Sequence, residues 1–410
     1  MILKETLKEI VVSQKKELSL IDEGVEREEL KKIQLNIPFA LVLSGIRRCG
    51  KSTLLIQLKK KVKNCYYFNF EDSRVANFEV SDFQKLKEIL RDEYGEKDYY
   101  FFDEIQNVPK WELFVRTELD KKKYIVITGS NASLLSRELG TRLTGRYLRH
   151  ELFPFSFAEF LKLVKKNPTI DSFEDYFVNG GFPEYLKVRR PDILRELFAD
   201  IITRDIVIRH NLRSLKTIKE MALYLLTNVG NKFTYHGLRK TFGLGSTNSV
   251  ISFISYFEDS YLLFTVPKFD YSFKKQLVNP KKIYSIDNGL SNVNSTSFCK
   301  DRGRMLENLT FINLRRKYKD IFYFQEKNEC DFVIKEGTNI TQAIQVCYTL
   351  NEDNKDRELN GLLEAIDKFK LKVGLILTYN QKDEFKIKNK RIKVLPVWNW
   401  LLNLNNSKIK

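Results

Sequence analysis

The fold is decided by one stretch, which runs Gly45-Ile46-Arg47-Arg48-Cys49-Gly50-Lys51-Ser52. It matches the pattern G-x-x-x-x-G-K-[ST], in which the backbone amides of a glycine loop surround nucleotide phosphates. An apolar run over 39–43 precedes the loop and predicts a buried strand, and leucines at helical spacing follow it over 51–63. Strand, loop and helix therefore come in the order that phosphate binding requires, because the amides and dipole of a helix N-terminus favour negative charge.

The side chains of this loop have separate expected roles. We expect Lys51 to reach the β- and γ-phosphates of ATP, and the Ser52 hydroxyl to hold Mg²⁺. The full set of expected nucleotide-binding residues is Gly45, Ile46, Arg47, Arg48, Cys49, Gly50, Lys51, Ser52, Thr53 and Ser130. The sequence thus predicts a site for ATP with Mg²⁺ as cofactor.

A second apolar run, Tyr99 to Phe102, ends in two acids, Asp103 and Glu104. An acidic pair at the end of a buried strand suits ATP hydrolysis, because Asp103 can hold Mg²⁺ and Glu104 can polarise the attacking water as a general base. Two solvated acids at a strand end are the alternative, which the P-loop upstream disfavours.

A third apolar run, Tyr124 to Ile127, is followed by polar residues at the predicted tip of its strand. Ser130 or Asn131 could contact the γ-phosphate or the attacking water there. The alternative is that they cap a helix that begins near Ala132, since Ser and Asn are common caps.

Two arginines follow, Arg142 and Arg146. Either could stabilise charge on the transferring phosphoryl group, within its own chain or in a neighbouring subunit. Exposed arginines or a salt bridge are the alternative. An arginine that acts in a neighbouring subunit would imply a homo-oligomer.

Strands and helices alternate through the first part of the chain, with a strand expected at 66–69 and helices at 81–91 and 111–119. Alternation of this kind predicts a parallel α/β sheet with right-handed crossovers. Ligands of such sheets bind at the carboxyl ends of the strands, where the P-loop, Asp103 and Ser130 all fall.

Taken together, these motifs resemble those of the prokaryotic AAA-type P-loop ATPases, abundant in archaea, that carry a C-terminal domain of unknown function. The segments that carry the resemblance are the paired arginines Arg47 and Arg48, then Phe102 to Glu112, Thr128 to Ala132, Leu143 to Arg146 and Gly180 to Glu184. The resemblance extends from about Ile33 to the C-terminus. It implies an AAA-like fold and ATP binding, and leaves the cellular purpose open.

The middle of the chain predicts a winged helix-turn-helix, with helices over 216–229, 234–242 and 246–257 and strands at 261–266, 276–278 and 282–285. In that fold Thr247, Asn248 and Ser249 would face DNA bases. Phosphates would meet the wing lysines Lys274, Lys275, Lys281 and Lys282. The alternative is a winged helix used for packing or oligomer contacts, which the lack of Arg or Lys between Ser246 and Glu258 supports.

The C-terminal third predicts a helix, three strands, a helix and a strand, an order that resembles the restriction-endonuclease core. Glu307 and Asp331 could supply its metal-binding acids. Its Glu-x-Lys pair is replaced by Gln345 and Cys347, and a neutral Gln is a weak Mg²⁺ ligand. We therefore expect a degenerate nuclease-like domain without cleavage activity. The lysine-rich segment over 382–393 is either a phosphate-binding strip or a solvated face.

Length and composition frame these expectations. The 410 residues carry a formal net charge of +17 and are 43% hydrophobic, which disfavours global disorder and favours a polyanionic partner such as DNA, or only lysine-rich solvated faces. Five cysteines without a C-x-x-C pair indicate reduced thiols and a cytoplasmic protein, and no apolar run is long enough for a membrane helix. The expected domains are 1–32, an N-terminal helical segment; 33–165, the ATPase; 166–213, a helical linker; 214–290, the winged helix; and 300–410, the nuclease-like domain.

The leading hypothesis is a Mg²⁺-dependent ATPase coupled to winged-helix and nuclease-like modules that act on or near DNA. A nucleotide-dependent switch or scaffold without DNA is one alternative, and an ATP-regulated nuclease is another.

Overall fold

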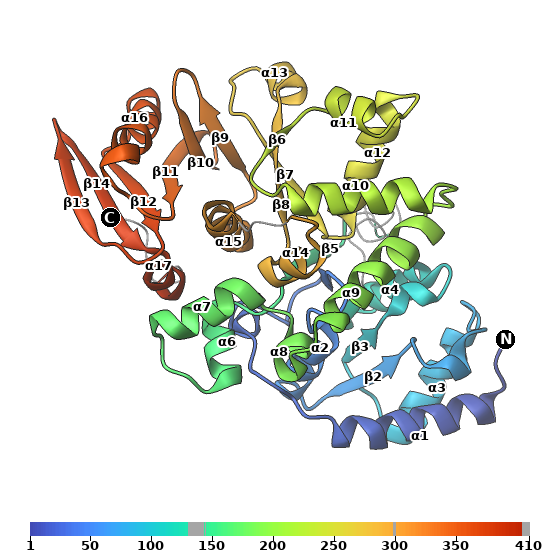
Figure 1. Ribbon diagram of the computed structural model, residues 1–410. Coiled ribbons are helices and arrows are strands. Elements are labelled where there is room, and N and C mark those ends of the chain that lie inside the picture. The colour runs from blue at the N-terminus through green and yellow to red at the C-terminus, as the bar shows by residue number, and fades with distance from the viewer. Residues whose placement is uncertain (130–142, 144, 298–300, 404–410) are drawn as a thin grey trace. The chain divides into compact units, whose positions relative to one another are not determined.

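The computed structural model describes residues 1–129, 143, 145–297 and 301–403. The chain forms two units, Met1–Phe153 and Pro154–Lys410, each of which is described by itself (Figure 1). Within the described ranges no helix is both long and apolar enough to cross a membrane. Cys49, Cys65, Cys330 and Cys347 are free thiols.

A five-stranded parallel sheet forms the centre of the first unit, in the order β2-β3-β4-β1-β5. The strands are β1 (Ala40–Gly45), β2 (Cys65–Asn69), β3 (Tyr99–Asp103), β4 (Tyr124–Gly129) and β5 (Tyr147–Leu152). The predicted parallel α/β sheet is confirmed. Because parallel strands end at the same edge, the segments after β1, β3 and β4 come together at the carboxyl edge, where sheets of this kind bind ligands.

Helices cover both faces of this sheet. They are α1 (Lys4–Leu20), α2 (Lys51–Lys60), α3 (Asp82–Tyr94) and α4 (Trp111–Asp120), with short 3₁₀ turns η1 (Glu28–Lys31), η2 (Ser73–Val75) and η3 (Ile105–Asn107). Alternate strand residues such as Val42, Phe102 and Ile127 belong to a core that includes Leu86 of α3 and Val115 of α4. On the other face α2 packs against β1, β3 and β4.

Strand β2 lies at one edge of the sheet, and α1 packs beside it. Gln14 of α1 accepts a hydrogen bond from the Asn69 backbone N–H (2.9 Å) and donates one to the Asn69 carbonyl (3.0 Å). One buried side chain thus satisfies two backbone groups that a neighbouring strand would otherwise pair. The backbone N–H of Ile2, just before α1, donates to the buried Asp82 carboxylate of α3 (3.2 Å).

The second unit begins with helices that pack around a buried carboxylate. They are α6 (Phe157–Val164), α7 (Ile170–Asn179), α8 (Pro183–Val188) and α9 (Pro191–Asp200), continued by the π-helix η4 (Ile201–Ile208), and α14 (Asn288–Asn294). Asp287 accepts hydrogen bonds from the backbone N–H groups of Gly181 (2.6 Å) and Leu290 (2.9 Å). A Cβ at Gly181 would lie 2.3 Å from the Phe155 carbonyl oxygen, so only glycine permits this packing.

The middle of this unit contains the three predicted helices, α10 (Leu215–Thr227), α11 (Tyr235–Thr241) and α12 (Thr247–Asp259). An antiparallel sheet in the order β6-β8-β7 accompanies them, from β6 (Lys232–Phe233), β7 (Leu263–Pro267) and β8 (Lys281–Ser285). The prediction of a strand at 276–278 is wrong, because these residues end the short helix α13 (Phe273–Val278). None of the α13 side chains is buried, so these residues do not pack one face against a core, as residues of a half-buried strand do.

The C-terminal part follows the predicted order, α15 (Arg302–Lys317), β9 (Ile321–Gln325), β10 (Glu329–Glu336), β11 (Asn339–Cys347), α16 (Glu352–Lys368) and β12 (Val373–Thr378). A hairpin, β13 (Asp383–Ile387) and β14 (Lys390–Pro396), and α17 (Val397–Asn403) complete it. The mixed sheet has the order β13-β14-β12-β11-β10-β9 (Figure 1). Phe332 packs on Phe311 of α15, whereas its neighbour Val333 shares a core with Leu362 of α16, so the two helices cover opposite faces.

Candidate nucleotide site and a cluster of acids and lysines

The glycine loop between β1 and α2 is held in a narrow space. A Cβ at Gly45 would lie 2.2 Å from the Leu152 carbonyl oxygen, and Gly50 has a φ of +97°, which L side chains rarely adopt. Helix α2 begins directly after Gly50 with no side-chain cap, so its first amides are available to an anion. Within the loop Arg48 is exposed and Arg47 is half-buried.

Lys51 and Arg27 bind the carbonyls of this loop. Lys51 is buried, and its Nζ donates to the carbonyls of Gly45 (3.2 Å) and Ile46 (3.1 Å). The fully buried Arg27 donates from Nη1 to the Cys49 carbonyl (2.6 Å) and from Nη2 to the Phe153 carbonyl (2.7 Å). Arg27 therefore ties the loop to the end of β5. Sequence inspection missed it, because its partners lie 22 and 126 residues away.

The predicted metal-binding residues come together beside the loop. Ser52 of α2 and Thr128 of β4 both hydrogen-bond to the buried Asp103 carboxylate at the end of β3. The Thr128 hydroxyl also accepts the backbone N–H of Glu104 at 2.9 Å. Glu104 adopts a left-handed backbone (φ +50°), and Gln106 donates to its carboxylate. Thr128 thus orients both acids, a role that the sequence did not indicate.

Asp103 is a buried acid without a cation. Burial raises the pKa of Asp103 to about 6, and the nearby Glu104 adds to this, against hydrogen bonds from Thr128 and Ser52. Among the described residues no lysine or arginine forms an ion pair with Asp103. Hydroxyl and carboxylate oxygens are the ligands that Mg²⁺ prefers, so Ser52 and Asp103 are the residues that would hold a Mg²⁺ ion.

Three of the predicted site residues, Ser130, Asn131 and Arg142, lie outside the described residues. Arg146 is described, and it lies away from the loop within its own chain. It directly precedes β5, whose first residue pairs with Ala40 at the start of β1, about 16 Å of strand from Gly45. It forms an exposed ion pair with Asp120. The prediction that Arg146 stabilises the phosphoryl group within its own chain is therefore wrong. Arg146 lies where the parallel strands begin, and the P-loop lies where β1 ends.

Two further side chains contact this region without a sequence signal. Arg149 of β5 donates to the Ser44 hydroxyl (3.1 Å), one residue before the loop, and pairs with Glu151 (2.7 Å). Tyr67 of the edge strand β2 hydrogen-bonds to Asp103. Only pairing between strands brings Tyr67 close to Asp103, so spacing along the chain could not reveal it.

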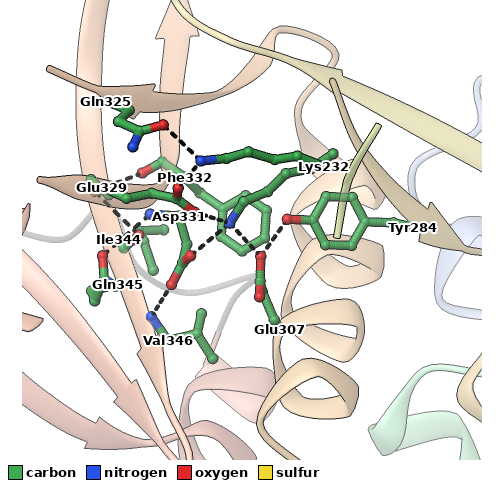
Figure 2. Close-up of polar contacts among 12 residues, drawn as sticks. Lys232, Tyr284, Glu307, Gln325, Glu329, Asp331, Phe332, Ile344, Gln345 and Val346 are labelled. Carbon is green, nitrogen blue, oxygen red and sulfur yellow. Dashed lines mark hydrogen bonds and ion pairs between the residues drawn. The ribbon is translucent and has the colours of Figure 1, made fainter. Parts of the chain in front are cut away.

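A second group of acids lies in the other unit, and lysines fill its centre. We call Lys232, Lys282, Glu307, Glu329 and Asp331 the acid–lysine cluster. Figure 2 shows the carboxylates of α15 and β10 directed toward one another. The Nζ atom of Lys282 lies 2.8 Å from Glu307, 2.7 Å from Glu329 and 2.8 Å from Asp331. Lys232 pairs with Glu329, and the Tyr284 hydroxyl donates to Glu307 (2.5 Å).

Charge in this cluster is largely neutralised. Lys282 is 2% exposed. Burial opposes its charge, but Asp331 and Glu307 outweigh that effect and raise the pKa of Lys282. Burial raises the pKa of Glu307 to about 7, against the effect of Lys282. The prediction that Lys281 and Lys282 meet DNA phosphates is wrong, because Lys281 is also buried and donates to the Leu277 carbonyl (2.8 Å).

The remaining predicted nuclease positions surround this cluster. Gln345 accepts the Asp331 backbone N–H (3.2 Å) and donates to the buried Glu358 (2.6 Å), so it links two strands and a helix. The Cys347 thiol donates to the Thr349 carbonyl (3.1 Å), and burial raises the pKa of Cys347 to about 11. In the described part of the chain no group of three or more His, Cys, Asp or Glu side chains is arranged to hold a metal ion.

Helix α13, at the tip between β7 and β8, exposes apolar side chains. Phe273 is 70% exposed, Val278 72% and the preceding Tyr271 77%. Lys274 and Lys275 are exposed beside them. Grouped apolar exposure of this kind usually marks a binding surface.

Comparison with known families divides the chain into three parts. A family model described as an AAA domain matches residues 38–161. Two models described as domains of unknown function, DUF8612 and DUF4143, match residues 170–297 and 302–400. The nucleotide site therefore falls inside the AAA match and the acid–lysine cluster inside the other two.

Relatives match the chain over nearly its whole length. The uncharacterized protein MJ1544 of Methanocaldococcus jannaschii is 37% identical over 435 residues, which cover 98% of this chain and 96% of that protein. An uncharacterized protein of Haemophilus influenzae is 31% identical and covers 89% of this chain and 94% of its own length.

Among solved structures, AMPPCP-bound DnaA from Aquifex aeolicus matches 56% of this chain and 85% of its own, with 16% identity and a TM-score of 0.30. Cdc6p from Pyrobaculum aerophilum matches 73% and 95%, with 13% identity and a TM-score of 0.26. Structural similarity at TM-scores this low does not support an inference about function.

Proposed function

Since this chain belongs to the same family as MJ1544 and carries an AAA domain over residues 38–161, we propose that it binds Mg–ATP and hydrolyses it at the P-loop of its first unit. The observation that supports this most directly is the meeting of Ser52 and Asp103, from two elements far apart in sequence, beside the uncapped start of α2. Mg²⁺ would supply positive charge that neutralises the phosphates during their transfer.

Each side chain then has a stated task. Lys51 exchanges the carbonyls of Gly45 and Ile46 for phosphate oxygens, since its Nζ already lies at the loop. Ser52 and Asp103 hold the cation. Glu104, placed by Thr128, accepts a proton from the water that attacks the γ-phosphorus, while the bond from that phosphorus to the bridging oxygen breaks and ADP leaves.

Two substitutions test this assignment. Lys51→Ala should weaken ATP binding by about 10-fold or more, because a charge-assisted contact is lost. Glu104→Gln should keep ATP binding and reduce turnover by about 100-fold or more, because the amide cannot take up the proton. Lys16→Ala and Glu96→Gln, at exposed positions of the same unit, are the matched controls. Wild-type turnover in both site variants would refute the assignment.

We do not extend the proposal to metal-dependent DNA cleavage. The ammonium of Lys282 lies between Glu307 and Asp331, the two acids that the nuclease-like reading of this domain assigns to metal. Gln345 and Cys347 replace the remaining acid and lysine. Linear DNA should therefore stay intact with Mg²⁺ or Mn²⁺, with and without ATP, and cleavage under either condition would reinstate the ATP-regulated nuclease.

For the middle of the second unit we propose a winged-helix-like module that contacts DNA mainly through the tip at α13. Exposed Tyr271 and Phe273 can stack on or wedge between bases, while Lys274 and Lys275 neutralise phosphates. Helix α12 carries no Arg or Lys, so the tip presents more positive charge to a polyanion than α12 does.

Salt and substitution test DNA contact separately from hydrolysis. Binding should weaken steeply with salt, and Phe273→Ala with Lys274→Ala should lower it by about 10-fold or more. Ile251→Ala with Asn248→Ala, on α12, is the control and should change binding less. Affinity that is flat with salt would refute DNA contact and favour a switch without DNA, whose signs are slow turnover and tight nucleotide retention. ATPase rates with and without DNA, on protein of measured solution mass, would also show whether a homo-oligomer forms.

A further inference from the structure

A cavity of about 430 Å³ lies in the first unit, away from the P-loop. It is formed by α1, the end of α2 and the segment after it, the start of β2, and the end of α3 and the segment after it. Cavities of this volume are typical of sites for small molecules. The nucleotide chemistry described above uses none of its side chains except Tyr67.

Positive charge dominates the wall of this cavity. Lys15, Lys59, Lys63 and Lys97 line it, against the single acid Glu93, which pairs with Lys8 at 3.1 Å. Across the described residues, Lys59, Lys63 and Lys97 form no ion pair with any acid. Several ammonium groups left unpaired around one cavity attract a polyanion, and phosphate oxygens suit them because lysine binds phosphate as a point charge.

Apolar and aromatic residues complete the wall, with Val11, Leu18 and Cys65 beside three tyrosines. Tyr66, Tyr67 and Tyr94 line the cavity, and Lys15 Nζ already lies 4.5 Å from the centre of the Tyr94 ring. Tyr66 is buried, and its hydroxyl donates to the Gly95 carbonyl (2.6 Å), so the half-buried Tyr67 and Tyr94 are the aromatic residues that can meet a ligand. Rings beside ammonium groups favour a ligand that is both planar and anionic.

Tyr67 joins the cavity to the nucleotide site. Tyr67 lines the cavity, and its hydroxyl hydrogen-bonds to Asp103, the proposed Mg²⁺ ligand. A ligand that moves the Tyr67 ring would therefore change the hydrogen bonding of Asp103. Since this side chain contacts both regions, it couples them by direct contact.

We propose that this cavity is a second anion site that takes a phosphorylated ligand with a planar aromatic ring, of the nucleotide class, and that Tyr67 couples it to Asp103. Binding in the cavity does not depend on the function proposed for the P-loop. The coupling rests on that function, because it acts through Asp103.

The test counts binding sites on the full chain with fluorescent MANT-ADP, in EDTA so that no turnover occurs. Wild-type protein should bind two equivalents, and Lys51→Ala should lose only the P-loop equivalent. Lys59→Ala with Lys63→Ala should weaken the other equivalent by about 10-fold or more, because two phosphate contacts are lost. Lys16→Ala with Lys31→Ala removes the same charge at exposed positions outside the cavity, and should leave both equivalents unchanged.

The proposal would be overturned if Lys59→Ala with Lys63→Ala weakened no equivalent. Failure of the P-loop function would instead leave a single equivalent, which Lys51→Ala does not change and Lys59→Ala with Lys63→Ala weakens. Inorganic tripolyphosphate serves as the ring-free probe. It should bind the cavity more weakly than MANT-ADP, and equal affinity would overturn the assignment of a planar ring.

Tyr67→Phe tests the coupling, since it keeps the ring and removes only the hydroxyl. The variant should still bind two equivalents. In wild-type protein, filling the cavity should shift the Mg²⁺ concentration needed for tight P-loop binding, and Tyr67→Phe should abolish this shift. A shift that persists in Tyr67→Phe would overturn the role of Tyr67.

Discussion

The nucleotide site and the acid–lysine cluster both bring buried carboxylates together, but the charge of these acids is balanced differently in the two places. In the cluster, Lys282 contacts three acids. At the nucleotide site Lys51 binds the backbone carbonyls of Gly45 and Ile46, and it acts on Asp103 only through its nearby charge, without an ion pair between the two. The contrast separates an acid that hydroxyls and a tyrosine hold in place, which we propose for a ligand, from acids that share a built-in lysine and stabilise the fold.

The largest effect should come from removing the built-in cation. Lys282→Met should lower the free energy of unfolding by about 3–5 kcal/mol, because three buried acids then lack their partner. Urea unfolding measures this, with Lys274→Met on the exposed α13 as control. Adding Glu307→Gln to Lys282→Met should recover part of the loss. A loss below about 1 kcal/mol would break the comparison, since the cluster would then not depend on its lysine.

The reverse sign is expected at the nucleotide site. Asp103→Asn should raise the free energy of unfolding of the nucleotide-free protein by about 1–3 kcal/mol, since the cost of burying an ionised acid disappears, while Mg²⁺-dependent turnover is lost. Asp92→Asn, at an exposed position, should change neither. If Asp103→Asn destabilises the protein, Asp103 is a structural acid and the contrast with the cluster fails.

The same acid should give a pH dependence. Burial raises the pKa of Asp103 to about 6, so between its ordinary value and pH 6 the folded protein holds a proton that the unfolded chain has released. Stability should therefore fall as pH rises through this window, and Mg²⁺ binding should appear over the same window. The difference in unfolding free energy between wild type and Asp103→Asn, measured from pH 4 to pH 8, isolates this group. A difference that is constant with pH would contradict it.

The smallest effect concerns a neutral donor. Tyr284→Phe removes the hydrogen bond to Glu307 and should cost about 1 kcal/mol, because Lys282 still neutralises that acid. Combined with Lys282→Met, the same change should cost more, since Glu307 then loses both partners. Strictly additive effects in the double-mutant cycle would show that tyrosine and lysine act independently.

The sequence predicted those parts of the fold that depend on residues close together in the chain. The P-loop and the acidic pair after β3 could be found because each lies within a few residues of a continuous apolar strand. The order of elements in the C-terminal domain could be predicted for the same reason, because its apolar residues recur over segments long enough to distinguish the helix period from that of a strand.

What the sequence did not predict depends on distant partners. Lys282 was expected at a DNA surface, and its true partners lie 25, 47 and 49 residues further on, on α15 and β10. Arg146 follows the segment Thr128 to Asn131 in the sequence. Because it precedes β5, it lies where the parallel strands begin, whereas the P-loop lies where β1 ends. Helix α13 was taken for a strand because an exposed tip carries no burial pattern that distinguishes the two.

The pairing of Gln14 with Asn69 has a consequence for how this protein could be shortened. A version that begins near Ile33 would keep every P-loop residue, yet it would remove α1 and leave the N–H and carbonyl of Asn69, at the end of the edge strand β2, without Gln14. Unpaired strand edges recruit the same edge of other molecules, so such a fragment should precipitate or form fibres as its concentration rises. We therefore expect α1 to keep the sheet soluble by covering its edge. A fragment that contains the whole nucleotide site but lacks α1 should not remain soluble.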